Sequence, residues 1–332
     1  MSKHSPDRFS VAPMMECTDR HCRAFHRLLT RETLLYTEMV TAAAIVHGDV
    51  DRLIGFDPSE QPVALQLGGS HPRELAAASR IGADLGYREI NLNCGCPSSR
   101  VHAGRFGACL MAEPRLVADC VAAMQAVVAV PVTVKCRIGI DDQDGEEALS
   151  AFVDAVAAAG CSTFILHARK AWLKGLSPRQ NREVPPLDHG RVHRLKQARP
   201  ELRIILNGGV RSLDEAKHHL RHVDGVMMGR AAYERPWMLA DVDRAIFGRD
   251  NPLASREAAL LQYLPHVERE RARAVPLKAM TRHLLGLYHG EAGGRQFRRV
   301  LSETAHLKEA DGRVILRALE WVARQARPEA AE

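Results

Sequence analysis

Eight short apolar runs, rich in β-branched residues, alternate along this chain with segments of helical periodicity. The runs are Phe9–Met14, Leu34–Val40, Pro62–Gly69, Glu89–Gly95, Pro131–Gly139, Thr163–Arg169, Arg203–Gly209 and Gly225–Arg230. The helical segments are Asp19–Leu29, Pro72–Gly86, Arg115–Val128, Glu146–Ala159, Val192–Arg199 and Leu213–His222, with another across Pro236–Ile246. The helix after the second run is less clear. This alternation over about 245 residues predicts an α/β chain folded as a (β/α)8 TIM barrel.

A doubly wound sheet is the alternative, but it usually has fewer strands and a glycine-rich turn after the first. Here the first run ends and is continued in Ala12-Pro13-Met14-Met15-Glu16, which contains no glycine. We therefore expect a barrel domain at residues 1–248.

The pattern changes after Asn251-Pro252, where helix formers continue without a strand run. Four helices are expected, at Arg256–Arg271, Pro276–Tyr288, Arg295–Glu309 and Gly312–Arg327. Residues 253–332 hold 14 Lys and Arg and 10 Asp and Glu, so they carry +4 of the net charge of +6. An all-helical, basic bundle at residues 252–328 is predicted, and its cations suggest a nucleic-acid partner.

Composition excludes several classes of protein. No segment approaches the roughly 18 consecutive apolar residues of a membrane span, and Met1–Arg8 lacks the apolar core of a signal peptide. The eight cysteines are scattered without zinc-type spacing, so reduced thiols, no metal and a cytoplasmic location are expected.

Polar residues stand where the predicted strands end, which is where a barrel places its active site. The candidate site residues at strand ends, polar and apolar together, are Pro13, Met14, Met15, Gln66, Asn93, Lys135, His167, Asn207, Gly208, Gly209, Gly229 and Arg230. Gln66 and Lys135 interrupt apolar strands, which is costly unless they face a site. The glycine turns after the seventh and eighth strands are typical of a phosphate cradle, with Arg230 as a further contact.

A phosphate on one side of the barrel, with a glutamine and a lysine across its mouth, fits flavin mononucleotide (FMN). Gln66 would bind the pyrimidine edge of the flavin ring, Lys135 its N1–C2 carbonyl region, and His167 the ribityl phosphate or ring. Cys96 lies between Gly95 and Pro97 on the loop after the fourth strand, where its backbone is constrained. It is the candidate catalytic thiol.

At these residues the chain resembles the tRNA-dihydrouridine synthases, most closely their A subfamily. The matching segments are Val11–Met14, Thr18–Arg23, Leu34–Met39, Val63–Gly69, Gly95–Ser98, Gly107–Leu110, Val132–Lys135, Arg137–Asp141, His167–Leu173, Asn207–Gly209, Gly229–Arg230, Thr281–His283 and Arg295–Arg299. They span both predicted domains.

The resemblance implies FMN, NADPH as reductant, and reduction of the uracil C5–C6 bond at positions 20 and 20a of the tRNA D-loop. Cys96 matches the family's acid, which protonates C5 after hydride reaches C6. Asn93 would meet the base, and Arg179, Arg182, Arg295 and Arg298 would bind tRNA. The partners expected are therefore tRNA and NADPH, with no membrane, and the chain is expected to act as a monomer. Cys94 is assigned to packing.

Two other functions remain open from the residues alone. A flavin barrel that reduces a small pyrimidine or enone would share the phosphate cradle and the acid cysteine, but would not need a basic helical domain. A tRNA-binding protein without catalysis would keep the charge but has no use for Gln66, Lys135 and Cys96 at strand ends.

Overall fold

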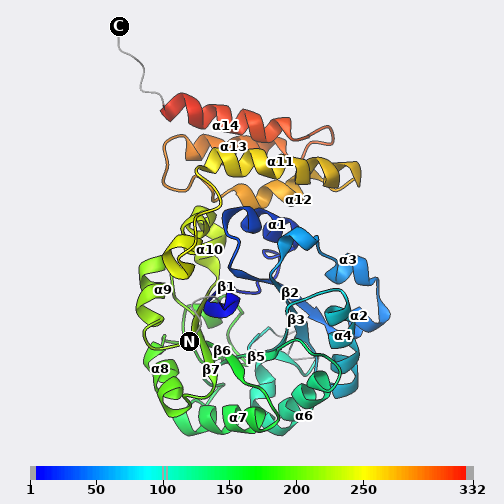
Figure 1. Ribbon diagram of the computed structural model, residues 1–332, viewed down its shortest axis with the longest axis vertical. Coiled ribbons are helices and arrows are strands. Elements are labelled where there is room, and N and C mark those ends of the chain that lie inside the picture. Colours follow the sequence, from blue (N-terminus) through cyan, green and yellow to red (C-terminus); the bar gives the residue numbers. More distant parts are fainter. Residues whose placement is uncertain (1–4, 99–100, 102–103, 327–332) are drawn as a thin grey trace. The chain divides into compact units, whose positions relative to one another are not determined.

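The computed structural model describes residues 5–98, 101 and 104–326, and within them the eight predicted strands form a closed parallel barrel in chain order. Figure 1 shows the strands ringed by helices. The strands are β1 (Phe9–Val11), β2 (Leu34–Thr41), β3 (Val63–Gly68), β4 (Glu89–Cys94), β5 (Val132–Arg137), β6 (Thr163–His167), β7 (Arg203–Asn207) and β8 (Gly225–Met228). The barrel closes by parallel pairing of β1 with β8, and the predicted fold is confirmed.

Helices connect successive strands, as parallel pairing requires. In the barrel unit they are α2 (Ala42–His47), α3 (Val50–Ile54), α4 (Pro72–Asp84), α6 (Pro114–Gln125), α7 (Glu146–Ala158), α8 (His189–Ala198) and α9 (Leu213–His219). Prolines open α4 and α6, while Asp188 and Ser212 cap α8 and α9 through their side chains. The α8 cap extends that helix three residues earlier than predicted.

The unclear connection after β2 consists of two short helices, α2 and α3. Gly48 lies between them. A glycine is favoured at this position because a Cβ atom would lie only 2.5 Å from the carbonyl oxygen of Ala44. Asp49 then starts α3 by accepting a hydrogen bond from the N–H of Arg52 at 3.0 Å. Neither helix is long enough to give a clear periodic pattern.

The chain divides into two compact units, and the second consists of Cys17–Glu32 and Arg230–Glu332. It therefore includes helix α1 (Arg20–Leu29) and residues 230–248, which the sequence analysis placed with the barrel. Packing explains the position of α1: the ring of Phe25 lies 5.3 Å from that of Tyr263, whose hydroxyl donates to the carbonyl of His21. Asp19, which caps α1, also pairs with Arg282 at 2.6 Å.

The other helices of this unit are α10 (Arg230–Glu234), the 3₁₀ helix η5 (Pro236–Asp241), the π-helix η6 (Asp243–Phe247), α11 (Arg256–Ala272), α12 (Leu277–Thr281), the 3₁₀ helix η7 (Arg282–Leu284), α13 (Gly294–Thr304) and α14 (Arg313–Ala326). The helix predicted over 276–288 is wrong in length, since α12 ends at Thr281 and a 3₁₀ turn follows. Gly286 lies in the part that is not α-helical, where a Cβ atom would meet the carbonyl oxygen of Glu234 at 2.2 Å. Among the described residues no helix has the length and apolar character needed to cross a membrane.

Apolar side chains fill one part of the barrel interior. One buried cluster takes Leu34 and Tyr36 from β2, one residue each from four other strands, and Ala12 just after β1; the other members are Ala64, Ile165, Ile205 and Met227. Alternate residues of a strand face the same side of a sheet, so these strands present an apolar face to the inside. Strands β4 and β5 contribute no residue to this cluster.

Glu89, at the start of β4, is buried beside this cluster. Its Oε1 atom accepts hydrogen bonds from the hydroxyls of Tyr36 at 2.5 Å and Thr133 at 2.6 Å. Burial raises the pKa of Glu89 to about 7, although these two hydrogen bonds favour the carboxylate. The folded chain therefore retains a proton that a glutamate in the unfolded chain, with a pKa of about 4.3, releases earlier.

Replacing Glu89 with Gln should change how stability depends on pH. The stabilisation from a raised carboxyl pKa is complete below the unfolded pKa and is lost as the pH rises through the folded value. Between about pH 4.5 and pH 8 the wild type should lose on the order of 3 kcal/mol relative to Glu89→Gln. Urea unfolding of both proteins across this range measures the difference, and parallel pH profiles would contradict a buried, titrating Glu89.

Candidate active site

A strip of polar side chains crosses the inner wall of β3 and β4. Gln66 donates from Nε2 to Oδ1 of Asn91 at 2.7 Å and accepts from Nδ2 of Asn93 at 2.8 Å. All three side chains are buried. Buried amides are costly unless they are hydrogen-bonded, and each of these has found its partners inside the barrel.

The loop that carries Cys96 is attached to this strip. Oδ1 of Asn93 accepts the backbone N–H groups of Gly95 at 3.1 Å and Cys96 at 3.0 Å. The carbonyl of Cys96 accepts the N–H of Ala108 at 2.9 Å. Next to it stands Gly107 with φ of +77°, where a Cβ atom would come within 2.6 Å of the Cys96 carbonyl oxygen. The backbone of Cys96 is therefore held from both sides.

The two neighbouring cysteines differ in exposure. Cys96 is partly exposed, whereas Cys94 is completely buried at the end of β4. Burial raises the pKa of the Cys94 thiol well above its usual value. The structure thus separates an accessible thiol from one that is enclosed in packing.

Lys135 lies on β5, opposite Asn93 in the register of the barrel. Its ammonium group donates to Oδ1 of Asn207 at 3.0 Å, and no carboxylate pairs with it among the described residues. Burial, followed by the positive charge of Arg137, lowers the pKa of Lys135 to about 8. A half-buried cation without a counter-ion is suited to an anionic ligand.

His167 and the glycines after β7 lie close together. The Nδ1 atom of His167 is buried without a partner in the part of the chain that the structure describes. Burial and the charges of Arg137 and Lys135 hold the pKa of His167 well below its usual value, so the ring is neutral. Gly208 has φ of +105°, and a Cβ atom on it would lie 3.2 Å from Nε2 of His167. Such a conformation and such crowding favour glycine.

Arg137 joins the Cys96 loop to the loop after β6. Its Nε donates to the carbonyl of Gly95 at 2.9 Å, and its Nη1 donates to the carbonyls of Lys170 at 3.0 Å and Asn181 at 2.9 Å. The buried side chain of Asn181 in turn binds the N–H and the carbonyl of Trp172. This second loop, residues 170–182, is therefore fixed against the first.

The remaining predicted residues occupy several elements. Pro13 and Met14 are half-buried after β1, and Met15 is 58% exposed. Asn207 ends β7 and donates to the carbonyl of Met227, Gly209 has φ of +78°, and Gly229 follows β8 with only side-chain atoms at 3.7 Å from a possible Cβ. Arg230 begins α10 of the second unit.

The arginines expected to bind tRNA are all exposed. Arg179 pairs with Glu183 at 3.6 Å within the loop after β6, and Arg182 ends the short helix η4 (Gln180–Arg182) of the same loop. Arg295 and Arg298 lie on α13 of the second unit.

Two residues that the sequence analysis missed, Asn91 and Asn181, complete the site. Asn91 connects Gln66 to Thr133, while the carbonyl of Asn181 accepts from Arg137 and so helps to fix the two loops. One signal was available: Glu89, Asn91 and Asn93 are spaced by two, which puts three polar side chains on one face of a single strand. Nothing local in the sequence marks Asn181.

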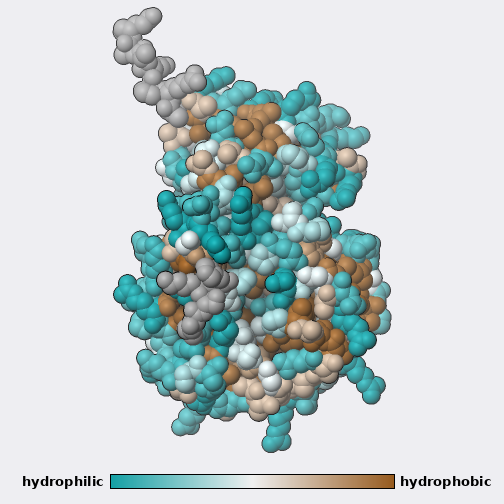
Figure 2. Space-filling model, in the orientation of Figure 1, coloured by the Kyte–Doolittle hydropathy of each residue, from teal (hydrophilic) through white to brown (hydrophobic). Residues whose placement is uncertain are grey.

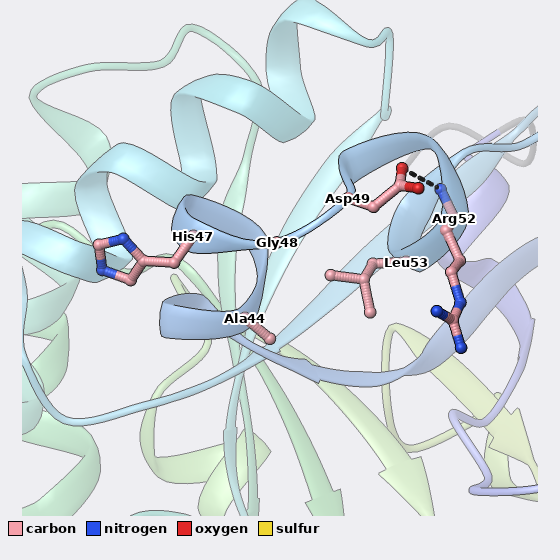
Figure 3. Close-up of a pocket in the computed structure, with 6 residues that line it drawn as sticks. All are labelled: Ala44, His47, Gly48, Asp49, Arg52 and Leu53. Atoms are coloured by element: carbon pink, nitrogen blue, oxygen red, sulfur yellow. Dashed lines mark hydrogen bonds between the residues drawn. The ribbon is translucent and has the colours of Figure 1, made fainter.

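A surface pocket of about 460 Å³ lies apart from these residues. It is formed by α2 and α3 and lined by Ala44, His47, Gly48, Asp49, Arg52 and Leu53, which Figure 3 shows in close-up. It contains none of the predicted site residues. Among the described residues, no group of three or more His, Cys, Asp or Glu is arranged to bind a metal ion.

Solved structures of low sequence identity share the fold. An old yellow enzyme homologue from Zymomonas mobilis superposes with a TM-score of 0.52 at 11% identity, covering 73% of this chain and 88% of that one. A 2-naphthoyl-CoA reductase gives a TM-score of 0.53 at 10% identity, covering 71% of this chain and 49% of the reductase. These similarities support the barrel architecture alone.

Sequence similarity is much closer within one family. The family model described as Dihydrouridine synthase (Dus) matches residues 10–325. A tRNA-dihydrouridine(20/20a) synthase of Xanthomonas axonopodis pv. citri is 58% identical over 94% of this chain and 93% of its own length. One of the same name from Escherichia coli K12 is 56% identical over 96% and 93%. The chain therefore belongs to the dihydrouridine synthase family, the flavin-dependent enzymes that reduce uridine to dihydrouridine.

Proposed function

We propose that this chain reduces uridines 20 and 20a in the D-loop of tRNA to 5,6-dihydrouridine, with FMN as its flavin, NADPH as reductant and Cys96 as proton donor. The name shared by the two relatives described above supports the tRNA positions. The proposal includes a monomer acting in the cytoplasm. The observation that carries it is the placement of Cys96, an accessible thiol whose backbone is bound directly to the buried amide of Asn93.

The residues around the barrel mouth fit FMN. The ammonium of Lys135 is hydrogen-bonded to Asn207 but has no counter-ion among the described residues, so it suits an anionic group. The unpartnered Nδ1 of His167 needs a polar partner. Gly208 and Gly209 adopt positive φ, and Gly229 leaves room for a ligand near the backbone. These are the features of a cradle for the phosphate.

When bound, FMN would supply the hydride that reaches C6 of uracil. The protein then has to deliver a proton to C5. The S–H group of Cys96 can donate this proton to C5 and be left as a thiolate. Asn93 would hold the base beside Cys96. The side-chain oxygen of Asn93 accepts the backbone N–H of Cys96, so the two residues are next to each other.

Recognition of tRNA is assigned to the four exposed arginines. Arg179 and Arg182 lie on the loop that Arg137 ties to the Cys96 loop, so phosphate contacts there would act close to the thiol. Arg295 and Arg298 have no ion-pair partner among the described residues, unlike Arg299, which pairs with Glu303 at 2.9 Å. Figure 2 shows a mostly hydrophilic visible face on the helical unit, with a smaller apolar area within it. Unpaired surface cations of this kind suit a polyanion.

The first test uses an unmodified tRNA transcript, NADPH and the purified FMN-loaded protein. Dihydrouridine should form at positions 20 and 20a, and Cys96→Ala should slow its formation by about 10²- to 10⁴-fold, the range for loss of a general acid. Bleaching of the flavin absorbance by NADPH should be unchanged, since the thiol is not needed for that step. Position mapping by mass spectrometry and stopped-flow absorbance measure the two steps.

Cys94→Ala is the matched control. It removes a thiol two residues away that is fully buried, so dihydrouridine formation should stay close to that of the wild type. Normal turnover by Cys96→Ala would refute the assignment of the acid, and dihydrouridine at other positions would refute the assignment of the substrate.

The second test concerns the arginines of α13. Changing both Arg295 and Arg298 to Ala should weaken tRNA binding and lower the slope of log K against log salt by about one unit for each phosphate that the variant no longer binds. Flavin content and NADPH oxidation should not change.

Arg299→Ala is the control here, because this residue lies on the same helix but is already paired with Glu303. It should alter the salt slope less than either Arg295→Ala or Arg298→Ala. Equal tRNA affinity of the double variant and the wild type, at both low and moderate salt, would leave the loop of Arg179 and Arg182 as the tRNA contact.

A further inference from the structure

A single chain of hydrogen bonds runs through the barrel from the Cys96 loop to Glu89. It begins with the backbone N–H of Cys96, which donates to Asn93, and continues from Asn93 to Gln66 and from Gln66 to Asn91. Nδ2 of Asn91 then donates to Oγ1 of Thr133 at 2.8 Å, and the Thr133 hydroxyl donates to Glu89 at 2.6 Å. In each of these hydrogen bonds, the donor belongs to the residue that is nearer to Cys96 along the chain of bonds.

The direction of the chain follows from its first link. A backbone N–H can only donate, so the oxygen of the Asn93 side chain must face Gly95 and Cys96, and its NH₂ group must face Gln66. Gln66 then has to present its oxygen to Asn93 and its NH₂ group to Asn91. Each amide in turn sets the orientation of the next.

Thr133 fixes the other end. Its hydroxyl accepts from Asn91 and donates its one proton to Glu89, so it is the link between the amides and the carboxyl group. Tyr36 also donates to the same Oε1 of Glu89, but none of the amides is among its hydrogen-bond partners. Two hydroxyls therefore contact Glu89, and one of them continues the chain.

We propose that Thr133, backed by Glu89, is a positioning residue for the reaction: through Asn91 it holds the amides of Gln66 and Asn93 in the one orientation that presents the correct donors and acceptors to the flavin and uracil. This inference rests on the proposed function. Both ligands carry edges on which C=O and N–H groups alternate. An amide turned by about 180° would set a donor against a donor and an acceptor against an acceptor.

Loss of the Thr133 hydroxyl would leave the NH₂ group of Asn91 without an acceptor in a buried site. The amides would then be held from the Cys96 side alone. Valine has nearly the shape of threonine and keeps its β-branching, so Thr133→Val removes the hydroxyl with little change in packing. Thr133→Ser keeps the hydroxyl, and Tyr36→Phe removes the other hydroxyl that contacts Glu89.

The experiment compares these three variants with the wild type in three measurements. They are the FMN dissociation constant of flavin-free protein, the single-turnover rate of dihydrouridine formation by pre-reduced enzyme, and the urea midpoint. Thr133→Val should raise the dissociation constant and lower the rate by about tenfold or more each, the size expected for one unmet buried hydrogen bond. Thr133→Ser should restore both to within about threefold of the wild type.

Tyr36→Phe separates positioning from stability. It should lower the urea midpoint as Thr133→Val does, yet leave FMN binding and the single-turnover rate close to the wild-type values. Equal effects of Tyr36→Phe and Thr133→Val on binding and rate would overturn the proposal, as would failure of Thr133→Ser to restore them. A wild-type protein that binds FMN but forms no dihydrouridine would overturn the proposed function alone, and the FMN dissociation constants would still decide the role of Thr133.

Discussion

The interior of a closed parallel barrel contains no bulk water, so each polar side chain that points inward must find its partner inside. In this protein the requirement is met along β3, β4 and β5. Hydrogen bonds join Asn93 to Gln66 and Gln66 to Asn91, and Thr133 then links Asn91 to Glu89. The apolar cluster around Tyr36 and Ile205 fills another part of the interior. The chain of buried amides therefore follows one arc of the wall, and the Cys96 loop begins where that chain ends.

The site combines satisfied and unsatisfied groups. The amides are hydrogen-bonded to one another and so cannot easily reorient, and their unused N–H groups keep a fixed direction. Lys135 and His167 differ, because one has no counter-ion and the other has a buried nitrogen without a partner among the described residues. Such a cost is kept in a folded protein where a ligand offsets it, and in the proposed function an anionic flavin would do so. Arg137 also connects the Cys96 loop to the loop of Arg179 and Arg182, because its guanidinium group donates hydrogen bonds to the carbonyls of Gly95 and Asn181.

Much of the fold could be predicted from the sequence, because every strand is a compact apolar run bounded by turn residues. The failures have local causes. Helices α2 and α3 are too short for a periodic pattern, and a 3₁₀ turn at Arg282–Leu284 ends the helix expected to continue to Tyr288. The grouping of α1 with the second unit depends on contacts with Tyr263 and Arg282, which lie far away in the chain. The strand-end residues could be named because barrels place their sites there, whereas Asn181 and Thr133 gain their roles only from tertiary hydrogen bonds.

In the proposed function, the buried amides of Gln66 and Asn93 form the surface that receives the flavin and the base. Side-chain amide NMR of flavin-free protein labelled with ¹⁵N at asparagine and glutamine tests it most directly, with signals assigned from Gln66→Glu and Asn93→Asp. Both NH₂ groups should exchange slowly with solvent and should shift when one equivalent of FMN is added. The exposed side chain of Gln197 on α8 should exchange fast and stay in place. If FMN binds while the signals of Gln66 and Asn93 do not move, the flavin lies elsewhere and this arrangement of the site is wrong.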